Sequence, residues 1–288
     1  MPWKADLAKV KFMIINTTIN VMKSISGKRL LIFLLLIVCQ INLSGIEPAL
    51  KGEPVKIKVL CYNLRFGELA TLEELASFID SIHPDVVALQ EVDVRTFRDR
   101  AKHQNGKDFI TELAFRTGML SAYGRTIDYA GGYYGIGILS RFPISETRRV
   151  MLPMPEGAKE QRALLLAGIE LPGGKGFTFV STHLDHSSSV VRKVQVKALN
   201  RALSGIRSPV VVAGDFNAKP DSPEIAVGMR KWRTACTNDF TISSSNPTSK
   251  IDYIFFAPAG RWRKTDAATP KVTLSDHLPL WAELELLF

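Results

Sequence analysis

Short apolar runs separated by turn residues dominate the pattern of hydrophobic and polar positions after residue 54. Several runs are rich in Val, Ile and Leu, and continuous runs of this kind are typical of strands buried on both faces. Prolines and glycines punctuate them, as in Phe142-Pro143 and Pro172-Gly173-Gly174. The pattern predicts strands over residues 55–64, 85–90, 135–141, 144–152, 163–171, 177–183, 209–213, 250–257 and 277–286.

Three other segments carry signs of helices. Thr-Leu-Glu-Glu at 71–74 has the form of a capping box, which predicts a helix that runs to about residue 82 and stops at His83-Pro84. Residues 107–117 predict a second helix. Over residues 191–202, apolar positions recur at helical spacing beside a stripe of Lys and Arg, which predicts an amphipathic helix with a solvated basic face.

The mixture of strands and helices favours one α/β (α+β) domain. No low-complexity linker, composition shift or internal repeat divides the chain after residue 50, so the domain is expected to span residues 46–288. Strands and helices in these numbers favour a core of two sheets flanked by helices.

The first 45 residues have the features of a targeting segment. Lys23, Lys28 and Arg29 precede an apolar run at 30–38, which is short for a membrane span but suits a signal-peptide core. Residues 1–45 are therefore expected to be an N-terminal extension and signal peptide, with Met22 as a natural start and cleavage within residues 40–45. The protein is then exported, that is, secreted or held in the periplasm or envelope. Two alternatives stay open, which are lipid attachment at Cys39 and an uncleaved membrane anchor.

Charge and cysteine content narrow the functional classes. The formal net charge is +9, but residues 1–44 hold six Lys or Arg against one Asp, so the remainder carries +4. This charge is too mild to imply a polyanionic partner. Because Cys39 lies in the leader, Cys61 and Cys236 are left, and they are expected to be buried thiols rather than a disulfide or a metal pair.

Polar, chemically competent side chains stand repeatedly where apolar runs end. Carboxylates and imidazoles are costly to bury without a partner or a metal, so six such ends suggest one shared site. Carboxylates with an amide favour a hard cation such as magnesium, and histidines outside that oxygen set could move protons. The run ends concerned carry Asn63, Glu91, His183, Asp215 with Asn217, Asp252, and Asp276 with His277.

The order and the amino-acid sequences of these segments resemble those of the endonuclease/exonuclease/phosphatase superfamily, which has the deoxyribonuclease I-like fold. Gly-Asp-Phe-Asn at 214–217 and Ser-Asp-His-Leu-Pro at 275–279 are the most specific pieces. Gln-Glu-Val at 90–92, Thr-His-Leu at 182–184 and Ile-Asp-Tyr at 251–253 fall in family order. The resemblance extends from about residue 55 to the end of the chain, and implies a four-layer α-β-β-α sandwich with the site at one rim of the packed sheets.

The same resemblance implies a metal-binding set. Glu91 corresponds to the principal ligand of Mg2+, with Mn2+ as the alternative ion. Asn63 would contact metal or phosphate, and Asp276 would be a further metal ligand, directly or through water.

The resemblance also implies roles in proton transfer and phosphate binding for the remaining residues. His277 would activate water as a base or stabilise the transition state as an imidazolium, with Asp252 fixing its tautomer. Asp215 would take part in proton transfer with the water or the leaving group, and Asn217 would contact phosphate or metal. His183 would donate to the leaving group or clamp phosphate. The competing interpretations are a local turn for 215–217 and a structural histidine at 183.

Two further positions have open roles. Arg162 could bind phosphate or form a rim salt bridge. Tyr133 and Tyr134, which follow two glycines, could stack on a substrate or cover a core edge.

The leading functional hypothesis is an exported Mg2+-dependent phosphoesterase that hydrolyses a phosphodiester or phosphomonoester by direct attack of water. The alternatives are a nuclease acting on DNA, a sphingomyelinase-like phospholipid phosphodiesterase, a catalytically silent binding module on the same fold, and a membrane-tethered interaction protein. The expected partner is a phosphoester substrate, which is a nucleic acid, a phospholipid head group or a small phosphate ester such as a sugar or inositol phosphate. No obligate protein partner is inferred.

Overall fold

Two six-stranded sheets pack face to face in residues 53–288, the part of the chain that the computed structural model describes. The first sheet has the strand order β11-β12-β1-β2-β4-β3. Its strands are β1 (Val55–Asn63), β2 (Val86–Val94), β3 (Leu120–Tyr129), β4 (Gly132–Ser140), β11 (Trp262–Ala268) and β12 (Leu280–Leu286).

The second sheet has the strand order β5-β6-β7-β8-β10-β9. Its strands are β5 (Ile144–Met151), β6 (Ala163–Leu171), β7 (Lys175–His183), β8 (Val210–Asp215), β9 (Arg233–Thr234) and β10 (Asp252–Ala257). Each sheet is mixed, because β1 runs parallel to β2 and β7 runs parallel to β8 while their other pairings are antiparallel.

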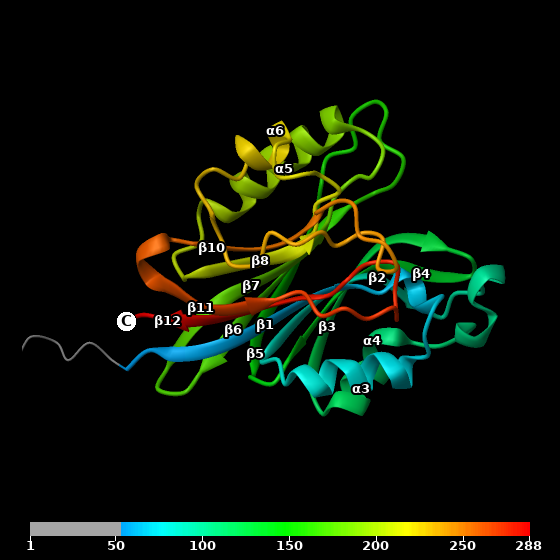
Figure 1. Ribbon diagram of the computed structural model, residues 1–288, viewed down its shortest axis with the longest axis horizontal. Helices are drawn as coiled ribbons and strands as arrows, with labels where there is room; N and C mark the ends of the chain where they lie inside the picture. Colours follow the sequence, from blue (N-terminus) through cyan, green and yellow to red (C-terminus); the bar gives the residue numbers. More distant parts are fainter. Residues whose placement is uncertain (1–52) are drawn as a thin grey trace, which may run out of the picture. The chain divides into compact units, whose positions relative to one another are not determined.

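Helices cover the outer face of each sheet, as Figure 1 shows, with α5 and α6 on one side and α3 and α4 on the other. Their bounds are α3 (Leu72–Ile82), α4 (Phe109–Thr117), α5 (Ser189–Leu203) and α6 (Pro223–Ala226), and short 3-10 turns are η1 (Arg65–Gly67), η2 (Asp99–Gln104) and η3 (Ala259–Arg261). The capping box at Thr71 is present, with reciprocal bonds between Thr71 and Glu74. This arrangement confirms the expected four-layer α-β-β-α sandwich.

The apolar runs form two cores. The larger one fills the space between the sheets and continues under α5, whereas the smaller one lies between the first sheet and α3 and α4. Phe216 is fully buried and packs edge-on against Tyr253 and Phe255, with ring centroids 5.6 and 5.2 Å away. Cys61 and Cys236 are buried free thiols, as the sequence predicts.

Three strands escape the sequence pattern, namely β3, β9 and β11. β3 and β11 lie at opposite edges of the first sheet and β9 lies at one edge of the second, and at least half of the residues in each are exposed, so they lack the apolar runs on which the prediction depends. From the sequence, the basic residues around position 262 predict either a solvated turn or the rim of a nucleic-acid site. Instead, Trp262 begins β11, is buried, and packs edge-on against Phe177 at 5.5 Å.

Residues Glu53–Phe288 form one compact unit. The expected signal peptide, the Met22 start and lipid attachment at Cys39 concern residues outside the described part of the chain. Within residues 53–288, the helices are too short or too polar for any of them to cross a bilayer.

Candidate active site

Strand pairing gathers the polar run ends at one rim of the sandwich. Asn63 and Gln90 are partners in the parallel pair β1 and β2 of the first sheet. In the second sheet, His183 pairs with Asp215 across β7 and β8, and Asp252 pairs with Asp215 across β10 and β8. Gln90 links the two sheets through a bond from its amide to Ser181 Oγ of 3.3 Å. The ends of these strands therefore face one another.

His277 and Asp252 form a buried pair at the centre of the rim. His277 Nδ1 lies 2.9 Å from Asp252 Oδ2, and its Nε2 lies 3.7 Å from Asp215 Oδ2. Burial lowers the pKa of His277, but the charge of Asp252, its hydrogen bond and the charge of Asp215 outweigh burial and raise the pKa to about 10. His277 is therefore an imidazolium at neutral pH, with Asp252 as acceptor of its Nδ1–H.

Asp215 contacts three other site residues. Its Oδ2 accepts a hydrogen bond from Asn63 Nδ2 at 3.1 Å and lies 3.4 Å from His183 Nε2, while Oδ1 accepts the backbone N–H of Asn217 at 2.8 Å. Burial, followed by the nearby charge of Asp252, raises the pKa of Asp215 to about 7. A carboxyl group of this kind can accept or release a proton near neutrality.

The tautomer of His183 follows from its contact with Arg162. An Arg162 Nη lies 2.9 Å from His183 Nδ1, and a guanidinium can only donate, so Nδ1 accepts and the ring proton lies on Nε2. Burial, then the charge of Arg162, lowers the pKa of His183, so the ring is neutral. A neutral Nε2–H can hold a phosphoryl oxygen by a hydrogen bond, which fits the clamp on phosphate better than the proton donor to a leaving group.

Arg162 is itself buried and forms an ion pair with Glu160 at 2.8 Å. Of the two roles expected for Arg162, phosphate binding and a rim salt bridge, the structure shows a salt bridge. The ion pair is buried rather than on a solvated rim. Its direct contact with His183 adds a function that the sequence does not show, which is to fix the orientation of that imidazole.

Glu91 and Asn63 supply oxygen atoms beside this cluster. Glu91 Oε1 accepts a hydrogen bond from Asn63 Nδ2 at 3.2 Å, which joins Glu91 to Asp215 through one amide group. Glu91 has a left-handed backbone with φ of 56° and lies in a β-bulge between Leu89 and Val92. The bulge turns the half-buried carboxylate toward the rim.

Asp276 is held apart from Glu91 by an arginine. Its carboxylate forms an ion pair with Arg65, whose backbone N–H also donates to Asn63 Oδ1 at 3.0 Å. Arg65 has a φ of 46°. Arg65 was not predicted from the sequence as a site residue, and its position two residues after Asn63 was the only signal for it. The structure thus brings Asp276 to the Asn63 loop, but through Arg65 rather than in direct contact with Glu91.

Asn217 forms the contacts of a local turn, and its expected contact with phosphate or metal stays a prediction. Its backbone N–H bonds to Asp215, as in a local turn, and its φ is 49°. Its side-chain amide donates to the carbonyl of Leu184 at 3.1 Å, which leaves the side-chain oxygen for another partner. Because Phe216 points into the core, Asp215 and Asn217 both face the rim.

The two tyrosines have different surroundings. Tyr134 is buried, and burial together with the charge of Glu91 raises its pKa, so its phenol lies close to the site. Tyr133 is 41% exposed and stacks with Arg125 at 4.8 Å. Nearby, Arg98 lies between the rings of Phe66 and Tyr129, an aromatic sandwich that no sequence motif marked.

The donor atoms suit a hard divalent cation. Glu91, Asn63 and Asp276 offer carboxylate and amide oxygens, which are the ligands that Mg2+ and Mn2+ prefer. In the described part of the chain, Asp215, Asp252 and His277 form the group whose candidate ligand atoms all lie within 4.8 Å of one another. Asp252 Oδ1 is buried with no hydrogen-bond partner, so this end of the site has an unused acceptor.

Comparisons with known proteins agree with this geometry. The sequence profile of the Endonuclease/Exonuclease/phosphatase family matches residues 60–277. The chain is 30% identical to the uncharacterized protein YbhP of Escherichia coli (strain K12) over 257 residues, which cover 80% of this chain and 96% of that protein. The chain therefore belongs to the Endonuclease/Exonuclease/phosphatase family, whose members hydrolyse phosphoester bonds and generally use a divalent metal.

Solved structures share the fold at lower sequence identity. An endonuclease/exonuclease/phosphatase from Bacteroides vulgatus superimposes with a TM-score of 0.66 at 21% identity, covering 81% of this chain and 99% of its own. The mannosyl-6-phosphatase Bt3783 of Bacteroides thetaiotaomicron gives a TM-score of 0.62 at 19% identity, covering 79% and 99%. These likenesses show the fold.

Proposed function

We propose that this protein is an exported, divalent-metal-dependent phosphoesterase that cleaves its substrate by direct attack of water on phosphorus. The observation that carries the proposal is the buried Asp252–His277 pair, whose free Nε2 lies 3.7 Å from Asp215. A carboxylate–imidazolium pair is costly to bury, and buried titratable groups of this kind cluster at functional sites. A silent binding module would have no need of it.

The protein groups divide the chemistry between them. His277 donates Nε2–H to a phosphoryl oxygen and stabilises the charge that develops there. Asp215, with its pKa raised to about 7, accepts the proton of the attacking water. His183 holds a second oxygen through its neutral Nε2–H, and Arg162 keeps that ring in position.

Glu91, Asn63 and Asp276 would hold the divalent cation. When bound, it supplies positive charge to the phosphoryl group and lowers the pKa of coordinated water. The carboxylate of Asp276 already forms an ion pair with Arg65, so Asp276 would contribute to the metal through water.

Small phosphate esters are the substrates that fit the charge distribution best. Residues 186–233 carry a net charge of +6, so the remainder of residues 45–288 carries −2. Most of the site comes from that remainder, and a nuclease usually surrounds its site with positive charge. The fold likeness to a mannosyl-6-phosphatase supports the same choice.

A substrate panel tests the proposal. Purified protein is assayed with sugar phosphates, inositol phosphates, sphingomyelin, plasmid DNA and abasic DNA, each with Mg2+, with Mn2+ and with chelator. The proposal expects metal-dependent release from at least one small ester, at a higher kcat/KM than from either DNA. A strong preference for DNA would agree with phosphoesterase activity but overturn the choice of small esters as substrates. If no phosphoester were hydrolysed, the proposed phosphoesterase function itself would be overturned.

A further inference from the structure

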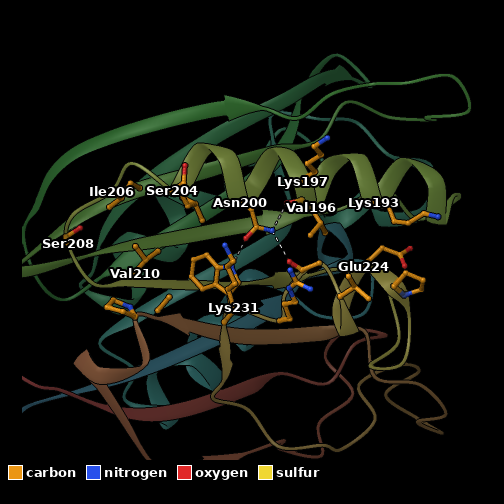
Figure 2. A pocket seen from close by; sticks show the side chains of 18 of the residues that line it. Lys193, Val196, Lys197, Asn200, Ser204, Ile206, Ser208, Val210, Glu224 and Lys231 are labelled. Atoms are coloured by element: carbon orange, nitrogen blue, oxygen red, sulfur yellow. Dashed lines mark hydrogen bonds between the residues drawn. The ribbon is translucent and has the colours of Figure 1, made fainter.

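A groove lies between α5 and the segment that follows α6, with a volume of about 790 Å3. Figure 2 shows Lys193, Val196 and Lys197 along α5 and Lys231 on the opposite wall, with Val210 toward the other end of the groove. Volumes of this size are typical of sites that bind a discrete ligand. The sequence pattern marks only the basic stripe of α5 and predicts a solvated face there.

This groove is separate from the active site. Val210, which lines the groove, begins β8, and Asp215 ends that strand; Ala257 lines the groove at the end of β10, and Asp252 begins it. Five residues of strand separate the two ends, which corresponds to about 17 Å. In the described part of the chain, none of the candidate catalytic residues lines the groove.

The floor of the groove is apolar. Val196, Leu203 and Val210 are buried there, and Val227 at its edge is 60% exposed. Two polar groups in the floor satisfy each other, because Trp232 Nε1 donates to Asn200 Oδ1 at 2.8 Å. An apolar chain can cover this surface without leaving those groups unpaired.

The rim of the groove is basic. Five exposed cations line it, and none of them forms a salt bridge within residues 53–288: Lys193, Lys197, Arg207, Arg230 and Lys231. Among the described residues, Glu224 is the one acid in the lining, and it is buried and ion-paired with Arg192 at 3.0 Å. Residues 186–233 hold nine Lys or Arg and three Asp or Glu, and five of those nine cations line the groove.

Exposed valines accompany the cations on α5. Val190 is 63% and Val194 is 38% exposed, and they alternate with Lys193 and Lys197 along the outer surface of the helix. Apolar and basic side chains on one helix face are typical of contact with an anionic lipid surface. Sites for single-stranded nucleic acid instead present exposed aromatic rings for stacking, whereas Trp232 is partly buried and bonded to Asn200.

We propose that this groove and the outer face of α5 bind an anionic phospholipid in a bilayer. The phosphate head group contacts the basic rim, and the upper part of an acyl chain lies on the apolar floor. The N-terminal segment does not fit as the occupant, because residues 1–44 carry six Lys or Arg and one Asp, the same sign of charge as the rim. The function of the groove is then to hold the enzyme at a membrane surface, while the active site lies at the opposite ends of β8 and β10.

Vesicle sedimentation of the full chain tests the proposal. The wild type is mixed with phosphatidylcholine vesicles and with vesicles that also contain phosphatidylglycerol, so that association through the leader is present in every sample. The test variant is Lys197→Glu with Lys231→Glu, and the matched control is Lys56→Glu with Lys271→Glu, two exposed lysines outside the groove that give the same change of net charge. Circular dichroism and Tm verify that both variants fold.

The proposal expects the phosphatidylglycerol-dependent part of binding to fall by about tenfold or more in the test variant and to change much less in the control. Val227→Asn, which removes an exposed apolar contact and no charge, is expected to weaken the same binding. Equal losses of this binding in the test and control variants would show that it depends only on net charge, and would overturn the proposal. So would binding without dependence on phosphatidylglycerol, or tighter binding of a DNA duplex that the test variant abolishes.

Discussion

At the scale of single residues, Asp215 connects the groups of the active site. Its two oxygens contact Asn63, His183 and the Asn217 backbone, and His277 lies 3.7 Å away. The sequence predicted these residues because each stands where an apolar run ends. It could not predict the proton positions, because the His183 tautomer depends on Arg162, which lies 21 residues away and carries no motif of its own.

Asp252 and His277 are expected to act as one unit, since a carboxylate that orients an imidazole has no task once the imidazole is removed. Asp252→Asn and His277→Ala are each expected to lower kcat by roughly 10²–10⁴-fold. The double variant is expected to lose little more than His277→Ala alone. Steady-state kinetics of the four proteins measure this, with Asp221→Asn, an exposed loop carboxylate, as control. Losses that multiply would contradict the pairing.

Asp215→Asn is expected to stabilise the metal-free protein at pH 8 while abolishing hydrolysis. The folded pKa of Asp215 is about 7 and the unfolded value is about 3.9, so the group favours folding below pH 4 and loses that contribution as the pH rises through 7. An amide does not titrate. Its Tm advantage should reach several degrees at pH 8, since 1 kcal/mol corresponds to about 2–4 °C in a domain of this size.

Thermal unfolding in chelator at pH 8 and pH 4.5 measures this difference for wild type and Asp215→Asn. The advantage of the variant should shrink at the lower pH. A lower Tm of the variant at pH 8, or a difference that does not vary with pH, would show that burial does not penalise the ionised carboxylate.

At the scale of the secondary-structure elements, strand register sets the site. The parallel pairs β1 with β2 and β7 with β8 end at the same rim, and β10 begins there. The sequence predicted most of these strands, because central strands carry continuous apolar runs. It missed β3, β9 and β11, because these edge strands have exposed polar faces and no such runs, and it could not predict which strands pair.

Gly214→Ala is expected to separate β8 from β7 and displace Asp215, the next residue. A Cβ at this position would lie 2.1 Å from the carbonyl oxygen of Thr182 on β7, so the backbone must move. We expect a loss of about 1–3 kcal/mol in the free energy of unfolding and a fall in kcat of at least about 100-fold. Denaturant unfolding and kinetics measure both quantities. Gly205→Ala is the control, because a Cβ there meets nothing within 4 Å; wild-type activity of Gly214→Ala would refute the argument.

At the scale of the whole molecule, export remains a prediction that rests on the basic start and the short apolar run at residues 30–38. We expect the mature protein to be smaller than the full chain and to be recovered from the secreted or envelope fraction. Mass spectrometry of that fraction should find an N-terminus between residues 40 and 47. A lipid-modified Cys39 would support the lipid anchor instead, and an intact residue 1 in the cytosol would contradict both.

The rate of phosphoester hydrolysis by Glu91→Gln, with and without Mg2+, tests metal-dependent catalysis at this rim most directly. The amide keeps the shape of the side chain and its contact with Asn63 but removes the charge that holds a cation. We expect wild-type activity to require Mg2+ and to vanish in chelator, and Glu91→Gln to lose roughly 10²–10³-fold in kcat with an unchanged fold. The exposed Glu146→Gln on β5 should retain wild-type activity. Full hydrolysis in excess chelator, or wild-type turnover by Glu91→Gln, would contradict the account.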